Sequence, residues 1–375
     1  MEVITYKCPN CGGDLTFDPA SGKYKCEYCL SSFTQEEAEK ANPGAAEAMN
    51  GEDNTAGAQE ATDAQEATDA QGGSGTAETK EKTAGSEAVV YTCPSCGAEI
   101  VTDATTAATF CFYCHNPVVL TGRLSGEYMP DAVLPFKISR DQVTEKFLSF
   151  VKKKRFIPRD FFDKNQVKKM TGVYFPYWIY GGDFEADYTA RGRKVRVWRT
   201  GDVEYKETSI YDVRRQGEIW VDGLSRNALN KADRDLIECV QPYRLEEMQP
   251  FSMGYLSGFQ AEKRDIEQKE IAPELKKELE QMARGAMQNE ASEYASLEQE
   301  KMHLSPKQEN WRYVLFPVWT LTYPGKDGKV YYYAMNGQTG AINGDFPFER
   351  KKVLMTSVVS ALLVLILMLL GGYFL

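Results

Sequence analysis

KCPNCGGDLTFDPASGKYKCEYC, residues 7–29, carries four cysteines in the pattern C-x2-C-x14-C-x2-C. Two C-x2-C pairs joined by a short loop are typical of zinc ribbons, in which two knuckles present four thiolates to one tetrahedral ion. The 14-residue gap is slightly shorter than usual for this pattern. We therefore expect a small β zinc ribbon, ribbon 1, over residues 1–34, with Cys8, Cys11, Cys26 and Cys29 as the metal ligands.

The same spacing recurs at a constant offset of 85 residues. Flanking residues match as well, including Tyr6 with Tyr91 and Gly12 with Gly97, as expected when one module has been duplicated. The second knuckles, CEYC and CFYC, lack the glycine that follows CPNC and CPSC. We expect ribbon 2 over residues 89–122, with Cys93, Cys96, Cys111 and Cys114 as ligands.

Four soft thiolates select zinc, with iron as the competitor. Pairing one half of each ribbon would close a 63-residue loop instead of a 14-residue one. That would cost an extra ~1.3 kcal/mol of closure entropy per site, so two local zinc ions are predicted. Four cysteines saturate a tetrahedral ion and leave no position for water, so both ions are expected to be structural. His115, which follows Cys114, is an alternative fifth ligand that a complete site does not need.

The aromatic residues of the two ribbons allow two interpretations. They could stack on nucleic-acid bases, or they could form the small cores of the ribbons, which is the more common arrangement. The residues concerned are Tyr24, Tyr28, Phe33, Phe110, Phe112 and Tyr113.

Residues 41–88 are expected to form a disordered acidic linker. Met49 is their only large apolar residue, and AQEATDAQEATDAQ repeats one hexapeptide. Ten acidic residues against Lys80 and Lys82 give the linker a net charge of −8, which leaves −2 for the rest of a chain whose total is −10. A helix is the rival interpretation, and the lack of an apolar stripe counts against it, as do Gly72, Gly73, Gly75 and Gly85.

Residues 130–346 are long enough for a core of their own and are predicted to form an α+β domain. Ser139 and Gln142 make a capping box for a helix that ends in the basic run 152–155, which either binds an anionic partner or complements the helix dipole. Strand-like stretches from 173 to 221 are separated by turn residues at 181–182, 191–192 and 201–202, which predicts a meander.

The rest of this domain is predicted to be a helical block followed by a pair of strands. The helical block covers residues 261–303, is interrupted near Pro273 and has an apolar stripe. The stripe consists of Leu275, Leu279, Met282 and Ala286. Two strands, 313–323 and 330–335, follow it.

FPYW at residues 175–178 recurs as FPVW at residues 316–319, each inside a predicted strand. The prolines indicate edge strands or bulges. The two segments form either a shared aromatic binding groove or two related half-sheets that pack a common core, and the second is the commoner arrangement.

The stretch VLMTSVVSALLVLILMLLGGYFL, residues 353–375, contains no charged side chain. As a helix it would measure about 34 Å, enough to cross a hydrocarbon core of about 30 Å. Arg350, Lys351 and Lys352 precede it, so the positive-inside rule places the N-terminal bulk in the cytoplasm. The sequence predicts a single-pass, tail-anchored protein of the cell membrane.

We find no motif for catalysis. The chain has two histidines, and phosphate-binding loops, dinucleotide-binding loops and nucleophile elbows are absent from the sequence. Cys239 stands apart from the eight paired cysteines and is most simply a small buried residue. We expect no enzymatic activity.

Taken together, the cysteine motifs, FPYW, FPVW and the apolar C-terminus resemble a family of bacterial membrane proteins with N-terminal ribbons of the transcription-factor-IIB type. The resemblance implies a membrane-tethered zinc-ribbon adaptor or scaffold, without catalysis, that contacts membrane lipid and binds protein partners at the cytoplasmic face. SPFH-domain and phage-shock-type proteins are the partner classes that it suggests. The alternative is a membrane-associated nucleic-acid-binding protein related to transcription or replication. The sequence disfavours that alternative, because ribbon 2 has no Lys or Arg between Tyr91 and Leu120 and phosphate recognition needs them.

Overall fold

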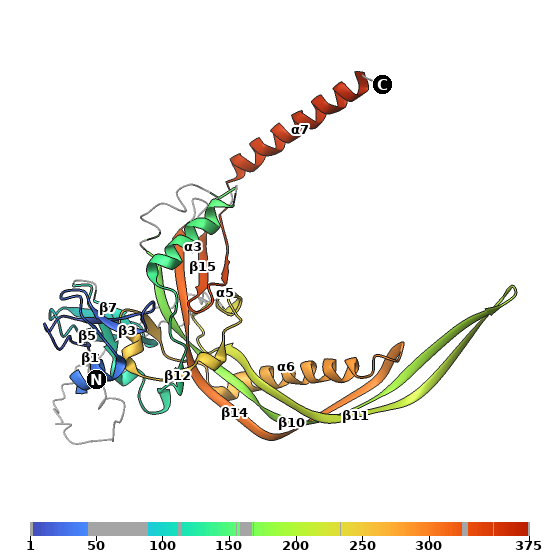
Figure 1. Ribbon diagram of the computed structural model, residues 1–375, viewed down its shortest axis with the longest axis horizontal. Helices are drawn as coiled ribbons and strands as arrows, with labels where there is room; N and C mark the ends of the chain where they lie inside the picture. The colour runs from blue at the N-terminus through green and yellow to red at the C-terminus, as the bar shows by residue number, and fades with distance from the viewer. Residues whose placement is uncertain are drawn as a thin grey trace, which may run out of the picture.

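The computed structural model describes residues 3–43, 89–111, 114–154, 156–157, 167, 169–232, 234–324, 329–347 and 349–373. The fold is α+β and confirms the predicted class, with two small β-rich modules that carry the cysteines, a central α+β domain and an apolar C-terminal helix (Figure 1). Most of the predicted disordered linker, residues 44–88, lies outside the described residues, as do Phe112, Tyr113 and Arg155.

Module 1, the described part of range 1–34, is a small antiparallel unit. Its strands are β1 (Val3–Ile4), β2 (Leu15–Asp18), β3 (Lys23–Cys26) and β4 (Ser32–Phe33), and helix α1 (Gln35–Ala41) follows them. A capping box between Thr34 and Glu37 starts α1. β2, β3 and β4 form a sheet of their own, whereas β1 leaves the module and pairs with a strand of module 2.

Module 2, the described part of range 89–122, repeats this plan. Its strands are β5 (Val89–Thr92), β6 (Glu99–Thr102), β7 (Thr106–Phe110) and β8 (Pro117–Leu120). β8 pairs with β1 of module 1, and β7 pairs with both β8 and β13 (Gln260–Glu262) of the central domain. Strands from both modules therefore belong to the main sheet of the protein.

The main sheet has eleven strands and runs in the order β1-β8-β7-β13-β10-β14-β15-β16. β11 pairs with β10, and β9 pairs with both β12 and β14. The remaining strands are β9 (Ala132–Val133), β10 (Thr171–Thr200), β11 (Val203–Asn227), β12 (Gln249–Pro250), β14 (Ser296–Pro324), β15 (Val330–Asn336) and β16 (Ile342–Gly344). The helices of this domain are α3 (Arg140–Lys152), α5 (Arg234–Glu238) and α6 (Gln268–Asn289).

The two F-P-x-W segments are neighbours at the centre of this sheet. β10 and β14 run antiparallel, and Phe175 lies opposite Phe316. On its other side, β10 first pairs in parallel with β13 and then, from Tyr177 on, antiparallel with β11. β14 likewise first pairs in parallel with β9 and then, from Val318 on, antiparallel with β15. The two halves of the domain are thus related by an approximate two-fold arrangement.

This arrangement explains how two prolines fit inside central strands, where the sequence had predicted edge strands or bulges. Pro176 falls between the β13 and β11 ladders, and Pro317 falls between the β9 and β15 ladders. Each carbonyl still accepts a backbone bond at 2.8 Å, Pro176 from Ala228 and Pro317 from Gly337. Because each missing N–H would point into a gap between two neighbouring strands, the sheet loses little ladder bonding.

The two tryptophans of these segments lock the halves together reciprocally. Trp178 donates its indole N–H to the carbonyl of Ile266 at 3.0 Å, just before α6 begins. Trp319 donates to the carbonyl of Ile138 at 3.0 Å, just before α3 begins. Each indole therefore fixes the point at which the other half's helix leaves the sheet.

The aromatic side chains of both segments are buried, so they pack a common core and do not line an open groove. Tyr177 and Phe316 stack with centroids 4.3 Å apart, and Trp319 meets Phe136 edge-on at 5.2 Å. Trp178 is 8% exposed and Trp319 is 4% exposed. Of the two interpretations of the repeated motif, the structure supports related half-sheets around one core.

The predicted meander is wrong, because 173–221 forms two long strands and one hairpin turn. Gly181 and Gly182 lie inside β10, where a Cβ would come within 2.4 Å of the Val221 carbonyl and 2.0 Å of the Gln308 carbonyl, respectively. The β10–β11 register shifts at this point. These glycines allow close approach of neighbouring strands at a bulge, while the predicted turn at 201–202 is present.

The predicted helical block 261–303 is also shorter than expected. α6 ends at Asn289, and residues from Ser296 on are strand, because they pair with β10. Pro273 lies inside α6, so the predicted interruption is absent. Leu275 and Leu279 are buried as predicted, but Met282 is exposed and Ile271, Ala283 and Met287 complete the buried stripe.

The C-terminal helix α7 (Arg350–Tyr373) stands away from the body of the protein (Figure 1). Its segment Lys351–Met368 has a mean hydropathy of 2.0 and no residue buried inside the protein. One helix is therefore long and apolar enough to span a membrane.

We expect Trp178→Phe and Trp319→Phe each to lower the free energy of unfolding by about 1–3 kcal/mol, because each leaves a buried or partly buried carbonyl without its donor. Urea unfolding of residues 1–349 measures this loss. Trp220→Phe is the matched control, since Trp220 is 71% exposed, and it should leave the stability unchanged. A reciprocal lock predicts losses of similar size at the two sites, so a loss at only one of them would contradict it.

Candidate metal centres and an exposed β arm

The four cysteines of module 1 surround a space that fits one metal ion. The Cys8 and Cys29 sulfurs are 3.6 Å apart, and the Cys11 and Cys26 sulfurs are 3.5 Å apart. All four lie within 4.8 Å of one another. Thiolates at about 2.3 Å from a tetrahedral zinc ion would be about 3.8 Å apart, so this geometry is compatible with one bound ion.

Module 2 repeats the arrangement. The Cys93–Cys114 and Cys96–Cys111 sulfur distances are both 3.7 Å, and again all four sulfurs lie within 4.8 Å of one another. The eight cysteines that the sequence nominated are thus gathered in two local groups of four. Within the part of the chain that the structure describes, these are the only groups of three or more His, Cys, Asp or Glu ligands that could hold a metal.

All four knuckles share one backbone turn. The residue after the second cysteine of each knuckle has a positive φ, at Gly12 (71°), Leu30 (59°), Gly97 (74°) and His115 (58°). Its N–H donates to the carbonyl of the first cysteine at 2.8–3.0 Å. Glycine adopts this conformation without strain, whereas leucine and histidine do not. The second knuckles therefore keep the turn although their sequences lack the glycine.

His115 has this backbone role, and its side chain is exposed outside the group of four sulfurs. The position of His115 therefore does not support the alternative in which it is a fifth metal ligand.

The environments of the cluster thiols differ from one another before any metal binds. Hydrogen bonds with the side chain and backbone of Ser31 lower the pKa of Cys29 to about 6. Burial raises the pKa of Cys114 to about 12. One thiol of module 1 is therefore ionised at neutral pH without metal, which favours capture of a cation.

Two opposite substitutions in module 1 test how much a non-glycine residue at the positive-φ position lowers the stability. We expect Leu30→Gly to raise the stability of the metal-loaded protein by about 1 kcal/mol, because Leu30 is 71% exposed and loses mainly backbone strain. Gly12→Ala should lower stability by about 1 kcal/mol, because the new Cβ meets no atom within 4 Å and only the backbone is affected. Thermal unfolding with bound metal measures both. Changes of the same sign in the two variants would rule out a shared turn.

Module 1 docks on the central domain through the segment 252–258. The hydroxyl of Ser257 donates to the Leu15 carbonyl at 2.5 Å, and the Phe17 N–H donates to the Ser257 carbonyl at 3.0 Å. Phe17 meets Tyr255 edge-on at 5.3 Å. Tyr24 is fully buried, and its hydroxyl lies 2.1 Å from where a Cβ of Gly254 would be. Tyr24 is therefore a core residue here, while Tyr28 is 77% exposed.

An ion cluster joins module 2 to the central domain beside the β7–β13 pair. Lys231 contacts the Asp103 carboxylate at 2.7 Å and the Glu262 carboxylate at 2.8 Å, and Thr105 donates to Glu262 at 2.9 Å. Burial raises the pKa of Glu262, whereas hydrogen bonds from Lys231, Thr106 and Thr105 outweigh burial and lower that of Asp103. Both modules are thus held by polar as well as apolar contacts.

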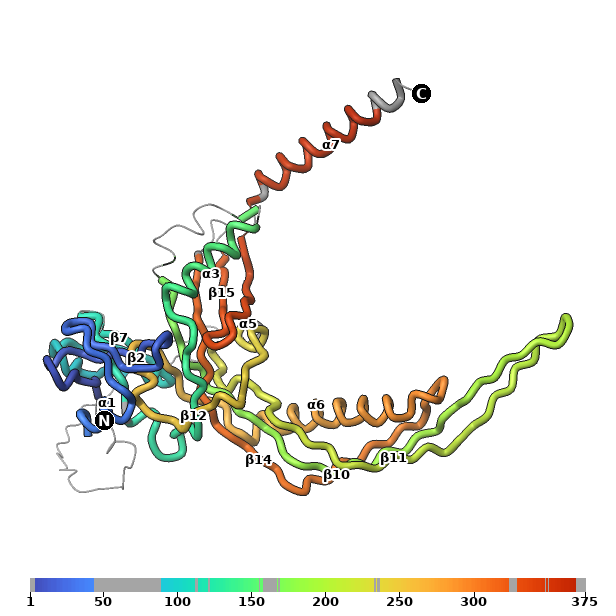
Figure 2. Tube along the Cα trace, viewed as in Figure 1, coloured from blue at the N-terminus to red at the C-terminus, as the bar shows by residue number. Residues whose placement is uncertain are grey.

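A two-stranded arm, residues 194–209, projects from the body of the protein (Figure 2). β14 accompanies β10 only as far as Arg193, which pairs with Ser296. Beyond that point β10 and β11 continue alone and close in the two-residue loop at Gly201, whose φ is +59°. The sequence predicted this turn but not the length of the hairpin.

Apolar and aromatic side chains remain exposed on the arm. Trp198 and Tyr205 stack across the strands with centroids 5.6 Å apart, and the Arg196 guanidinium lies 5.6 Å from the Trp198 ring. Val197 and Val203 are each more than half exposed. A hairpin with two strands is at most marginally stable alone in water, so this surface gains from a partner.

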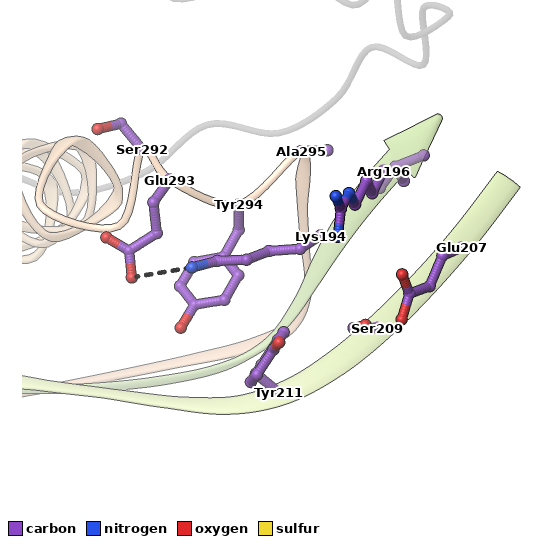
Figure 3. Close-up of a pocket in the computed structure, with 10 residues that line it drawn as sticks. Lys194, Arg196, Glu207, Ser209, Tyr211, Ser292, Glu293, Tyr294 and Ala295 are labelled. Atoms are coloured by element: carbon purple, nitrogen blue, oxygen red, sulfur yellow. Dashed lines mark ion pairs between the residues drawn. The ribbon is translucent and has the colours of Figure 1, made fainter. Parts of the chain in front are cut away.

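An open cavity of about 570 Å³ lies at the base of the arm, beside the end of α6 (Figure 3). Lys194 reaches across it towards Tyr294 and Glu293, with its ammonium 4.7 Å from the Tyr294 ring and 4.0 Å from the Glu293 carboxylate. Tyr211 closes the other side, 5.8 Å from Tyr294. The cavity is polar and wide, and its cation is already engaged by these rings.

A histidine and a serine meet on the sheet surface. Ser305 lies 3.2 Å from Nε2 of His303, and Asp187 pairs with His303 in register. The Asp187 carboxylate accepts hydrogen bonds from Arg214 at 2.7 Å and Gln216 at 2.9 Å, and these lower its pKa. The carboxylate is thus engaged by Arg214 and Gln216. Cys239, which the sequence suggested is buried, is exposed.

The features described so far define a protein with two four-cysteine clusters that could each hold a metal ion, a central α+β domain with a projecting arm and, among the described residues, an apolar helix long enough to span a membrane. The chain is 29% identical over 351 residues to the uncharacterized protein YdjG of Bacillus subtilis (strain 168), covering 94% of this chain and 92% of that protein. No protein-family model matches the chain, and no solved structure matches it.

Proposed function

We propose that the chain is a membrane-tethered zinc-ribbon adaptor, without catalysis, whose arm docks protein partners at the cytoplasmic face of the cell membrane. The observation that carries this proposal is the arm, because its exposed aromatic pair and unpaired strand edges match two common modes of protein recognition. Tryptophan, tyrosine and arginine dominate the binding energy of protein interfaces. An exposed strand edge accepts an extended segment of another chain by β-augmentation.

The other parts have supporting roles. Each four-cysteine cluster takes one zinc ion, which is saturated by the four thiolates and holds its module rigid. α7 anchors the chain, and the basic residues 350–352 before it favour a cytoplasmic position for residues 1–349. SPFH-domain and phage-shock-type proteins remain the first partner classes to test.

Nucleic acid is a weaker candidate ligand. Module 2 has no Lys or Arg in the range 91–120. In the basic stretch 191–196, Arg193 is paired with Glu298 at 2.7 Å, and Lys194 is engaged at the cavity. Arg196 lies over the Trp198 ring, which leaves Arg191 as the one cation of this stretch without such a contact among the described residues. A zinc ion held by four thiolates also carries a formal charge of −2. A phosphate backbone would need free, clustered cations.

Metal analysis tests the zinc part of the proposal. We expect two zinc ions per purified chain, falling to one in Cys8→Ser or Cys93→Ser, while Cys239→Ser is the matched control and keeps two. Because β1, β7 and β8 belong to the main sheet, chelation should lower the unfolding temperature of the central domain as well as of the modules. A single ion, or iron with visible colour, would contradict the assignment.

Photocrosslinking in cells tests the arm. A photoreactive amino acid placed at Val197 or Tyr205 of the full chain should form adducts with a discrete protein, and Trp198→Asp should reduce these adducts at least tenfold. The matched control is the same amino acid at Val101, which is 66% exposed in module 2.

The arm is refuted as the docking surface if the adducts formed at Val101 equal those formed on the arm. It is also refuted if the arm forms no adducts. Nucleic-acid adducts would favour the alternative function. Substitution on the arm is a cleaner test than deletion of a module, because deletion removes strands from the main sheet.

A further inference from the structure

The base of α7 is tied to the chain just after α3. The backbone N–H of Glu349 donates to the carbonyl of Phe156 at 2.9 Å, and the Lys352 ammonium donates to the carbonyl of Ile157 at 3.1 Å. The Phe150 ring near the end of α3 packs on Phe346 with centroids 5.3 Å apart. These contacts fix the C-terminal end of α3 beside the start of the apolar helix.

Three consecutive lysines occupy that end of α3. Lys152, Lys153 and Lys154 are all exposed, and Lys154 lies over the Phe150 ring at 5.0 Å. Within the described part of the chain, no carboxylate forms an ion pair with any of the three, whereas Lys352 is paired with Glu349 at 2.6 Å. A helix dipole accounts for one basic residue at a C-terminus, but it does not account for three unpaired ones beside an apolar helix.

Simple lengths place these lysines at the membrane surface. The apolar stretch starts at Val353, four residues after Glu349, which is about 6 Å along a helix. The headgroup layer on each side of a bilayer is about 5–7 Å thick, so the Glu349–Phe156 contact lies within or just below it. Lys154 is two residues from Phe156, within about 7 Å along the chain. Its long side chain therefore reaches the phosphate level.

We propose that Lys152, Lys153 and Lys154, together with the exposed Lys351, form a surface that binds the anionic headgroups of phospholipids. The proposal rests on α7 being the membrane anchor proposed above, and it adds a second contact that sets the orientation of the domain on the membrane. Charge complementarity and continuity with the anchor favour a lipid surface over other polyanions. Each lysine near an anionic surface strengthens association with that surface by roughly fivefold.

The test uses the full chain reconstituted in vesicles of phosphatidylcholine, with or without phosphatidylglycerol, that contain a trace of lipid with a nitroxide headgroup. A fluorescent amino acid replaces the exposed Ser149, one turn before Lys153. We expect strong quenching that increases at least twofold with phosphatidylglycerol and returns to its lower value in high salt. The triple variant Lys152→Gln, Lys153→Gln, Lys154→Gln should lose the increase.

Two controls accompany this measurement. The probe at Ala20 in module 1 should stay unquenched, and the double variant Lys23→Gln, Lys25→Gln, which removes two exposed charges from module 1, should leave the Ser149 signal unchanged. Flotation of the vesicles reports the anchor separately.

The outcomes separate the two proposals. The headgroup site is overturned, and the anchor is kept, if the protein floats but the probe at position 149 is not quenched. The same holds if the quenching changes neither with lipid charge nor with substitution of the lysines. Protein that does not float overturns the anchor, and the headgroup site with it. Soluble RNA that lowers the quenching at position 149 as much as high salt does would show a surface for polyanions in general. That result would also overturn the lipid assignment.

Discussion

The reciprocal bonds of Trp178 and Trp319 are the constraint on which the rest of the central domain depends. Each indole comes from one half of the sheet and ends on the carbonyl that precedes the helix of the other half. A change in the β10–β14 register would shift the two halves against each other and disturb both bonds at once. One register therefore satisfies both indoles together, and a shift by one residue would turn the aromatic core outward.

The sequence identified the features with strong local signals. The spacing of the eight cysteines, the capping box at Ser139 and the apolar run after Val353 each depend on residues close in the chain, and the structure places them as expected. The predictions were wrong at residues whose local structure is set by neighbours distant in the chain. Gly181 and Gly182 have turn chemistry, yet they relieve contact with strands more than 30 residues away in the chain, at Val221 and Gln308. Polar residues after Ser296 look helical alone, but pairing with β10 overrides that preference.

The two cysteine modules differ from free-standing ribbons because they are built into the central domain. Tyr24 and Phe17 of module 1 belong to the same buried cluster as Phe136 and Trp319 of the central domain. A metal ion bound in module 1 would therefore stabilise more than its own knuckles, since it would fix the surface against which the segment 252–258 packs. The sequence could not show this, because the linker between the modules suggests independence while the contacts are made with residues more than 200 positions away.

The position of the arm within the sheet explains how it can extend so far. β10 and β11 are continuous from the core to the tip. The first part of β10 is held by β14, up to Arg193, and the paired last part of β11 packs beside α6, while residues 194–209 project. The glycine bulge at 181–182 lies within the held part, where it changes the register without ending either strand. The end of α3 is meanwhile held beside the start of α7 by the Phe150–Phe346 contact and by the bond from Glu349 to Phe156. The fold thus keeps its apolar helix and its exposed hairpin far apart (Figure 1), which is the arrangement that the proposed scaffold would need.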